Sequence, residues 1–241
     1  MPNPKTMTLR LAQKILCAAL LIALTGGCAT HDHFATHAVL PDDGHHQAAF
    51  SRAEQTIKNL FPARYRATKR AIVTVGGRQF TCDGLLEVSP TDGCHLAIVS
   101  SFGVLTDLRV NTDGGCELVK VTPLFREDWS RQFVARDLRR LFTAPANLQP
   151  AGQLADGSVV LQTPPDASGM IAYYIFSTDG ARWRELDLTR SGKIFYRATS
   201  KDFRKYPDTS AEIPGEFDVR AEAYRLELRI TELTVAKEAQ P

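Results

Sequence analysis

The sequence lacks an excess of charge of either sign. Its 29 Lys and Arg residues nearly balance 27 Asp and Glu residues, which leaves a formal net charge of +2 over 241 residues. A nucleic-acid-binding domain is normally clearly basic, so this balance argues against a nucleic-acid partner. Hydrophobic residues make up 44% of the chain and charged residues 23%, which is average for a globular protein and excludes general disorder.

The chain also lacks the short motifs of common enzymes. It contains no Gly-x-Ser-x-Gly, no His-Glu-x-x-His, no phosphate-binding loop and no dinucleotide fingerprint. His95 is the only histidine after residue 46, and its neighbour Cys94 would point to the opposite face of a strand. The two therefore form no nucleophile and base pair, and we expect His95 to be buried or to lie at the end of a turn. We predict no enzyme, no cofactor and no metal site in the folded domain.

A hydrophobic run long enough to span a membrane is likewise absent. Ile15–Leu24 are ten apolar residues, and as a helix they would cover only about 15 Å, half the hydrocarbon core of a bilayer. They follow three basic residues and precede Thr25-Gly26-Gly27. A basic head, a short apolar stretch and small residues predict that residues 1–27 are a secretory signal peptide.

Small residues directly before Cys28 resemble a bacterial lipoprotein signal, in which the cysteine is acylated and becomes residue one. Cys28 is therefore the expected lipid anchor, and two or three acyl chains would hold it firmly, since one chain holds only marginally. By resemblance to sorting in enteric bacteria, Ala29 favours the outer membrane, with the protein on its periplasmic face. An ordinary secretory cleavage site is the alternative. Cleavage would leave 26 basic and 27 acidic residues, a net charge of −1.

The segment after the anchor is rich in histidine. Residues 28–47 show little apolar periodicity and contain five of the six histidines: His31, His33, His37, His45 and His46. We interpret this segment as a flexible tether. A metal-handling tether is the alternative, because His-x-His and His-His pairs can ligate zinc, copper or nickel, although the spacing matches no closed zinc motif.

Two segments have the spacing of amphipathic helices. In residues 48–61 apolar side chains recur every three or four residues, and Pro62 ends the pattern. In residues 126–142 the apolar side runs from Trp129 to Phe142. The other side of that helix carries Arg131, Arg136, Arg139 and Arg140. We interpret this basic side as solvated, with lipid phosphates as the alternative partner.

Most of the remaining chain, from residue 65 to 231, is predicted to form short strands. Gly76-Gly77, the turn at 90–93, the tip Phe102-Gly103 and the turn at 112–115 are separated by eight to twelve residues, which is typical of an antiparallel meander. We expect about eleven strands, a loop that contains Pro145 and Pro150, and a polar loop at 201–212. The apolar face of such a sheet must be buried against other elements, and the two amphipathic helices can cover part of it. The predicted fold is mainly β (α+β), a strongly curved antiparallel sheet or half-open barrel with a helical lid, in one domain at 48–236 followed by a tail at 237–241.

Two stretches resemble the LolA/LolB family of periplasmic lipoprotein carriers and outer-membrane lipoprotein receptors. Leu96–Leu108 (LAIVSSFGVLTDL) resembles a receptor strand, its hairpin tip and the returning strand, while Ile213-Pro214 and Tyr224–Leu228 fit the end of that fold. The resemblance covers about residues 48–235. It departs at 143–212, which lacks the receptor's Gly-Trp-containing pattern.

The resemblance implies a protein that binds acyl chains, or lipid or acylated lipoprotein cargo, in an apolar cavity, with a periplasmic carrier protein as a further candidate partner. An accessory lipoprotein of an envelope-lipid or pigment pathway is the alternative, with the same cavity and another ligand. We expect the cavity to be lined by the apolar positions that alternate along the strands, or else to be a filled core. These positions are Phe80, Leu86, Val88, Ile98, Leu108, Leu226, Leu228 and Ile230.

Phe102 lies between Ser101 and Gly103, at the tip of a predicted hairpin. By resemblance, the receptors place an exposed leucine at this tip, and an aromatic ring suits the bilayer interface equally well. Phe102 is therefore a candidate for contact with the membrane or the cargo. The alternative is a ring that folds back onto its own sheet.

Three cysteines of the domain could be oxidised in the periplasm. Cys94 and Cys116 each follow a Thr-Asp-Gly turn at the same end of the meander, whereas Cys82 falls toward the other end, so if one disulfide forms we expect Cys94–Cys116. Strands two apart lie about 9.6 Å from each other, beyond the usual span of a disulfide. The bridge therefore requires that the intervening strand has already ended.

Overall fold

The computed structural model describes residues 46–101, 103–122, 127–209 and 211–236, all of which belong to one compact unit, Thr36–Pro241. The predicted signal peptide, Cys28, the tether up to residue 45, Phe102 and the tail lie outside the described residues. Among the helices of the described part, none has the length and apolar character needed to cross a membrane.

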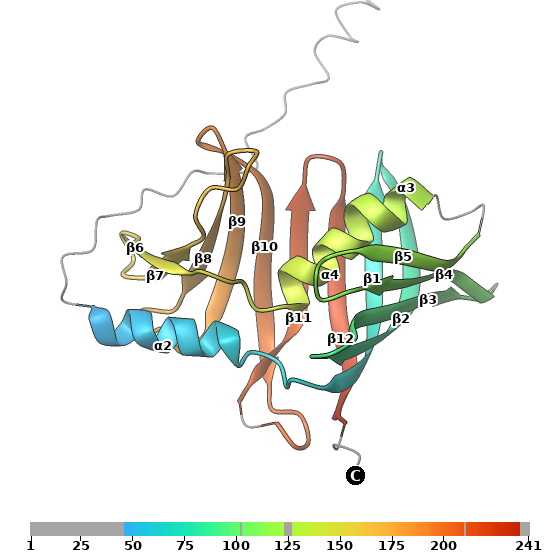
Figure 1. Ribbon diagram of the computed structural model, residues 1–241, viewed down its shortest axis with the longest axis horizontal. Helices are drawn as coiled ribbons and strands as arrows, with labels where there is room; N and C mark the ends of the chain where they lie inside the picture. The colour runs from blue at the N-terminus through green and yellow to red at the C-terminus, as the bar shows by residue number, and fades with distance from the viewer. Residues whose placement is uncertain (1–45, 102, 123–126, 210, 237–241) are drawn as a thin grey trace, which may run out of the picture. The chain divides into compact units, whose positions relative to one another are not determined.

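Twelve strands form a single antiparallel sheet. Their bounds are β1 Tyr65–Val75, β2 Arg78–Ser89, β3 Gly93–Ser100, β4 Gly103–Val110, β5 Cys116–Val121, β6 Gln149–Gln153, β7 Val159–Gln162, β8 Met170–Phe176, β9 Trp183–Arg190, β10 Lys193–Arg204, β11 Ile213–Ala221 and β12 Arg225–Val235. The order is β5-β4-β3-β2-β1-β12-β11-β10-β9-β8-β7-β6. Two meanders thus join where β1 pairs with β12, and the described sheet curves without closing, since β5 and β6 are its two edges (Figure 1).

The predicted fold class is confirmed, with one strand more than expected. The twelfth strand is β6, in the segment that was expected to be a loop because of its prolines. Pro150 is tolerated there because β6 is an edge strand, whose outer side needs no backbone donor. In addition, β10 continues to Arg204, so the expected loop at 201–212 is shorter than predicted.

The β1–β2 hairpin sets which side chains face each side of the sheet. Its turn residues Gly76 and Gly77 both have positive φ, 52° and 75°, as a type I′ turn requires. The resulting register places Arg66 opposite Glu87 and Arg70 opposite Asp83, with ion pairs of 2.7 and 2.9 Å on the outer face. The odd-numbered residues of β1 and the even-numbered residues of β2 therefore face inward.

Both helical segments lie on the same side of the sheet (Figure 1). They are α2 at Gln47–Lys58 and a continuous segment made of α3 Glu127–Trp129, the π-helical η1 Ser130–Val134 and α4 Ala135–Phe142. We call the second segment, Glu127–Phe142, the lid helix. Its π turn places the buried Ser130 hydroxyl 3.2 Å from that of Thr106 on β4. Such a turn often marks a functional site.

The first helix, α2, docks on the turn between β8 and β9. A Cβ at Gly180 would lie 2.2 Å from the carbonyl oxygen of Ala49, so only glycine allows this approach. Thr56 donates a hydrogen bond from Oγ1 to the carbonyl oxygen of Gly180 at 2.9 Å. The apolar face of α2, with Phe50 and Ile57, is buried against this half of the sheet.

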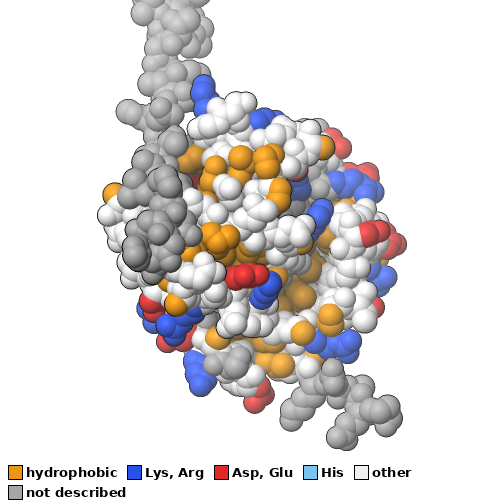
Figure 2. Space-filling model, turned by 60° about the vertical axis from the view of Figure 1, so that its left-hand side comes forward, with side chains coloured by type: hydrophobic (Ala, Val, Ile, Leu, Met, Phe, Trp, Pro, Cys, Tyr) orange, Lys and Arg blue, Asp and Glu red, His pale blue; other side chains and the backbone are white. Residues whose placement is uncertain are grey.

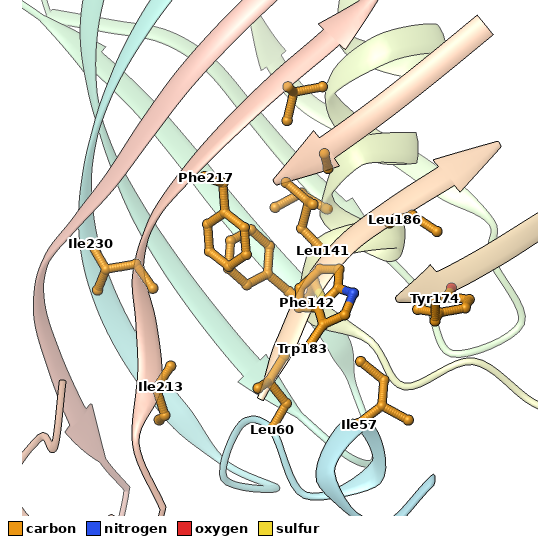
Figure 3. Close-up of a cluster of buried hydrophobic side chains, with 14 of the residues drawn as sticks. Ile57, Leu60, Leu141, Phe142, Tyr174, Trp183, Leu186, Ile213, Phe217 and Ile230 are labelled. Atoms are coloured by element: carbon orange, nitrogen blue, oxygen red, sulfur yellow. The ribbon is translucent and has the colours of Figure 1, made fainter. Parts of the chain in front are cut away.

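Aromatic side chains join the lid helix to the second meander. Trp183 of β9, Phe217 of β11 and Phe142 of α4 lie side by side in the core (Figure 3). The ring centroids of Phe142 and Phe217 are 5.6 Å apart, and those of Trp183 and Phe217 are 5.8 Å apart. The C-terminal end of the lid helix therefore packs against the core of the sheet.

Candidate functional site

A cavity of about 100 Å³ lies between the lid helix and the inner face of β1, β2, β3 and β12. Its walls are predominantly apolar. The sheet contributes Ala71, Val73, Cys82, Gly84, Leu96, Ile98, Leu226 and Leu228, and the lid helix contributes Trp129, Phe133, Val134, Leu138, Leu141 and Phe142. Such a space can shelter apolar groups and excludes water from the few polar atoms that reach it.

An aromatic cluster lies at the start of the lid helix. Trp129 and Phe133 are four residues apart and so share one helix face, with ring centroids 5.2 Å apart. Tyr224, from the connection between β11 and β12, lies edge-on to Phe133 at 5.2 Å. All three residues line the cavity, so this cluster forms part of the contact between lid and sheet.

Asp137 is a buried carboxyl on the inner face of the lid helix. Tyr224 donates a hydrogen bond from its hydroxyl to Asp137 Oδ2 at 2.6 Å, and the Arg140 guanidinium lies 3.8 Å from Oδ1. Burial raises the pKa of Asp137 to about 6, although the Tyr224 hydrogen bond and the Arg140 charge partly oppose this shift. At neutral pH the lid helix therefore carries a carboxylate inside an apolar site.

Lys69 is a buried amine on β1 that also lines the cavity. Only 3% of the residue is exposed, and Nζ lies 3.0 Å from the ring centroid of Phe142 without a hydrogen-bond partner in the described structure. Burial lowers the pKa of Lys69 well below its usual value. Its cross-strand neighbour on β2 is Gly84, which carries no side chain and leaves room for the long lysine.

A larger, open cleft of about 870 Å³ lies on the other side of the lid helix end. Leu141 and Phe142 line both spaces and so separate the cavity from the cleft. The cleft combines apolar side chains, among them Leu60 and Met170, with the guanidinium groups of Arg136, Arg139 and Arg140. On the face seen in Figure 2, hydrophobic side chains reach the surface in several patches set among charged ones.

Comparison with known proteins finds similarity in three-dimensional structure only. No family model and no curated protein matches the sequence. A domain from Vibrio parahaemolyticus named for outer membrane lipoprotein sorting superposes with a TM-score of 0.53 at 12% identity, over 80% of this chain and 94% of that chain. A LolA superfamily protein from Nitrosomonas europaea gives 0.52 at 10% identity, over 80% and 95%. The chain has a LolA/LolB-like fold. Identities this low establish the fold alone.

Within this LolA/LolB-like fold, the eight residues predicted to line the cavity occupy different places. Ile98, Leu226 and Leu228 line the cavity beneath the lid helix, and Val88 lines the open cleft. The remaining residues are Leu86, Leu108 and Ile230, fully buried in the core, and Phe80.

The placement of Phe80 in the cavity lining was wrong. Alternation puts it on the inner face of β2, but 56% of the residue is exposed and it is absent from the cavity lining. It lies three residues after Gly77, close to the β1–β2 turn. Alternation along a strand specifies a face and says nothing about how far the covering helix extends.

The interpretation of the four arginines as one solvated face was also too simple. Arg140 is mostly buried against Asp137 and the ring of Tyr196, with 16% of its side chain exposed. Arg131 pairs with Glu127 at 3.0 Å and donates to the carbonyl oxygen of Cys116 at 2.7 Å. Both arginines therefore contribute to the packing of the fold, and Arg140 also lines the cleft.

The expectations for His95 and the cysteines were wrong as well. His95 is half-exposed within β3, and its Nε2 lies 2.6 Å from Asp107 Oδ1 on β4. Cys82, Cys94 and Cys116 are free thiols. Val110 of β4 pairs with both Cys94 and Cys116, so the intervening strand has not ended and separates the two thiols.

No metal centre is found in the part of the chain that the structure describes, where no three His, Cys, Asp or Glu residues group together. Four of the five tether histidines lie outside that part, and metal binding by the tether stays a prediction.

Sequence reasoning missed the polar groups beneath the lid helix, although signals for them were present. Lys69 occupies an inward-facing position of β1, between Ala67 and Ala71, where a lysine interrupts the alternation of apolar residues. Asp137 falls three or four residues from Phe133, Val134 and Leu141, on the apolar side of a helix. Titratable groups at such positions are candidates for function because burial is costly for them.

Proposed function

We propose that this protein shelters the acyl chains of lipid or lipoprotein cargo beneath its lid helix, and that acylated Cys28 holds it on the periplasmic face of the outer membrane. The observation that carries the proposal is the apolar cavity between lid helix and inner sheet face. The shared fold supports it, since one structure of that fold is named for outer membrane lipoprotein sorting. The proposed role is binding and transfer, without catalysis.

The size of the cavity implies that the lid helix moves outward when cargo binds. A space of about 100 Å³ is smaller than a cavity of about 150 Å³ that holds one benzene molecule. The polar links from lid helix to the rest of the protein include the hydrogen bonds Asp137–Tyr224 and Ser130–Thr106. We therefore take the described arrangement, with the lid helix against the sheet, to be the closed one.

A charge placed in the cavity wall should strongly weaken binding of an acyl-chain probe. Leu228 is partly buried and lines the cavity, so Leu228→Asp is expected to weaken binding of a fluorescent fatty acid at least about tenfold while the protein stays folded. The matched control is Leu85→Asp, because Leu85 is 46% exposed on the outer face of β2. Unchanged binding in both variants would contradict the proposal. Unfolding of Leu228→Asp, and of Leu226→Asp as well, would favour a filled core.

We further propose that Phe102 contacts the membrane or the cargo. It lies outside the described residues, between Ser100 and Gly103, which pair as the last residues of β3 and the first of β4. Phe102→Glu is expected to reduce cosedimentation with vesicles of phosphatidylethanolamine and phosphatidylglycerol severalfold, with thermal stability unchanged. Phe80→Glu provides the control, since Phe80 is exposed near a different hairpin. A large drop in melting temperature for Phe102→Glu would instead place the ring in the folded core.

A further inference from the structure

Lys69 is a buried amine beneath the lid helix. Its Nζ is buried, lines the cavity and lacks a hydrogen-bond partner among the described residues, while the ring of Phe142 lies against it. The titratable groups facing this region include Tyr65, whose hydroxyl is likewise unpartnered among the described residues, the thiols of Cys82 and Cys94 and, on the lid helix, Asp137. Asp83 and Tyr224 also line the cavity, and Asp83 pairs with Arg70. The carboxyl of Asp137 is engaged by Tyr224 and Arg140.

A buried charge without a partner is strongly destabilising, and an unpartnered amine still loses its hydrogen bonds to water. A methionine or leucine at position 69 would fill the same space without this cost. The lysine therefore supplies something that the apolar wall cannot, namely a donor of up to three hydrogen bonds and, once protonated, a positive charge. Both properties suit an anion that enters the cavity.

We propose that Lys69 binds the acidic head group of the cargo, and that the cargo is an amphiphile with a single anionic group, a carboxylate or a phosphate monoester. The inference rests on the proposed function and names its ligand class. The hydrocarbon chain would lie along the apolar wall formed by Ile98, Leu226 and the lid helix. The anion would displace the Phe142 ring from Nζ and form a charge-assisted hydrogen bond in a water-poor site, where such bonds are strong.

The neighbouring cleft provides a favourable route for such a head group. Arg136, Arg139 and Arg140 line the cleft, and Leu141 and Phe142 alone of the lid helix residues there also line the cavity. Guanidinium groups around an opening raise the local concentration of anions. An acidic amphiphile would therefore be attracted at the cleft and would reach Lys69 when Phe142 moves aside.

The test compares ligands that share one chain and differ in the head group. Oleate, oleoyl lysophosphatidate and oleyl alcohol compete with a fluorescent fatty-alcohol probe for the full-length protein, wild type and Lys69→Met. We expect wild type to bind at least one acid about tenfold or more tightly than the alcohol, and Lys69→Met to bind acid and alcohol alike. The control is Lys201→Met, at a lysine whose side chain is 57% exposed, and it should behave like wild type.

The outcomes separate this inference from the proposed function. Equal binding of acids and alcohol by wild type, or a preference for acids retained in Lys69→Met, would overturn the role of Lys69 and leave cavity binding intact. Failure of all three ligands to bind would overturn the proposed function. Whichever of oleate and oleoyl lysophosphatidate binds more tightly identifies the preferred head group as a carboxylate or a phosphate monoester. Lys69→Met should be at least as stable as wild type, and Lys69→Gln gives the same comparison should the methionine variant fail to fold.

Discussion

Replacing Trp183 with alanine is expected to lower the free energy of unfolding by about 3–5 kcal/mol, because the change leaves a large cavity in the packed core. Trp183 is 1% exposed, its ring lies against Phe217 and Tyr174, and its Nε1 donates to the carbonyl oxygen of Glu185 at 2.9 Å. A typical domain is stable by about 5–15 kcal/mol, so the loss would be a large share of the total. Urea unfolding followed by circular dichroism measures it.

Replacing the other tryptophan of the chain, Trp129, is expected to affect ligand binding more than stability. Trp129 lies in the lid helix, lines the cavity and is only partly buried. Trp129→Ala should therefore lower the free energy of unfolding by about 1 kcal/mol and weaken binding of an acyl-chain probe severalfold. The main effect of Trp183→Ala, in contrast, should be the loss of stability. If Trp129→Ala destabilised the protein as much as Trp183→Ala, the segment would belong to the core and would not act as a lid.

Much of the fold could be predicted because local signals act independently of distant contacts. The Gly76-Gly77 turn fixes the β1–β2 register by itself, since both residues must adopt positive φ. The apolar face of residues 126–142 likewise specifies a helix before its partner is known. Strand β6 escaped prediction because Pro150 argues against a strand unless the strand is known to lie at an edge, and edges are set by the whole sheet.

The candidate site was harder to predict because it depends on how far the lid helix reaches. Alternation correctly grouped Leu228 and Phe80 on inward-facing positions, yet one lines the cavity and the other is exposed. The disulfide prediction failed for a related reason, since Val110 continues β4 between Cys94 and Cys116. How far a strand continues, and how far a helix covers it, depends on tertiary contacts and cannot be deduced from the spacing of residues along the chain.

Asp137 should make the protein less stable as the pH rises from about 4 to about 6. The pKa of Asp137 is about 6 in the folded protein, against about 3.9 for an unfolded chain. Between these values the folded state binds more protons than the unfolded state, so the free energy of unfolding falls with rising pH and levels off above the window. The difference of about two units between the folded and unfolded pKa values corresponds to a fall of at most about 3 kcal/mol in the free energy of unfolding.

Asp137→Asn should remove this pH dependence, because the amide is neutral throughout and can still accept the hydrogen bond of Tyr224. We expect the variant to match wild type near pH 4 and to gain about 2 kcal/mol relative to it by pH 7, as measured by urea unfolding at several pH values. Asp156→Asn is the control. Hydrogen bonds from Ser158 hold the pKa of Asp156 at about 2, so that variant should differ from wild type by a constant amount above pH 5.

The same carboxylate should control how readily the lid helix opens. Opening exposes Asp137 to water and relieves its desolvation, so the ionised group favours the open state at neutral pH. In the proposed function cargo enters only the open state, so Asp137→Asn is expected to slow uptake of a fluorescent fatty acid about tenfold at pH 7.5, measured by stopped flow. At pH 5 wild-type Asp137 is mostly protonated, and the two proteins should then take up the probe at similar rates. Equal rates at pH 7.5 would show that Asp137 has no part in opening, and that its raised pKa affects folding alone.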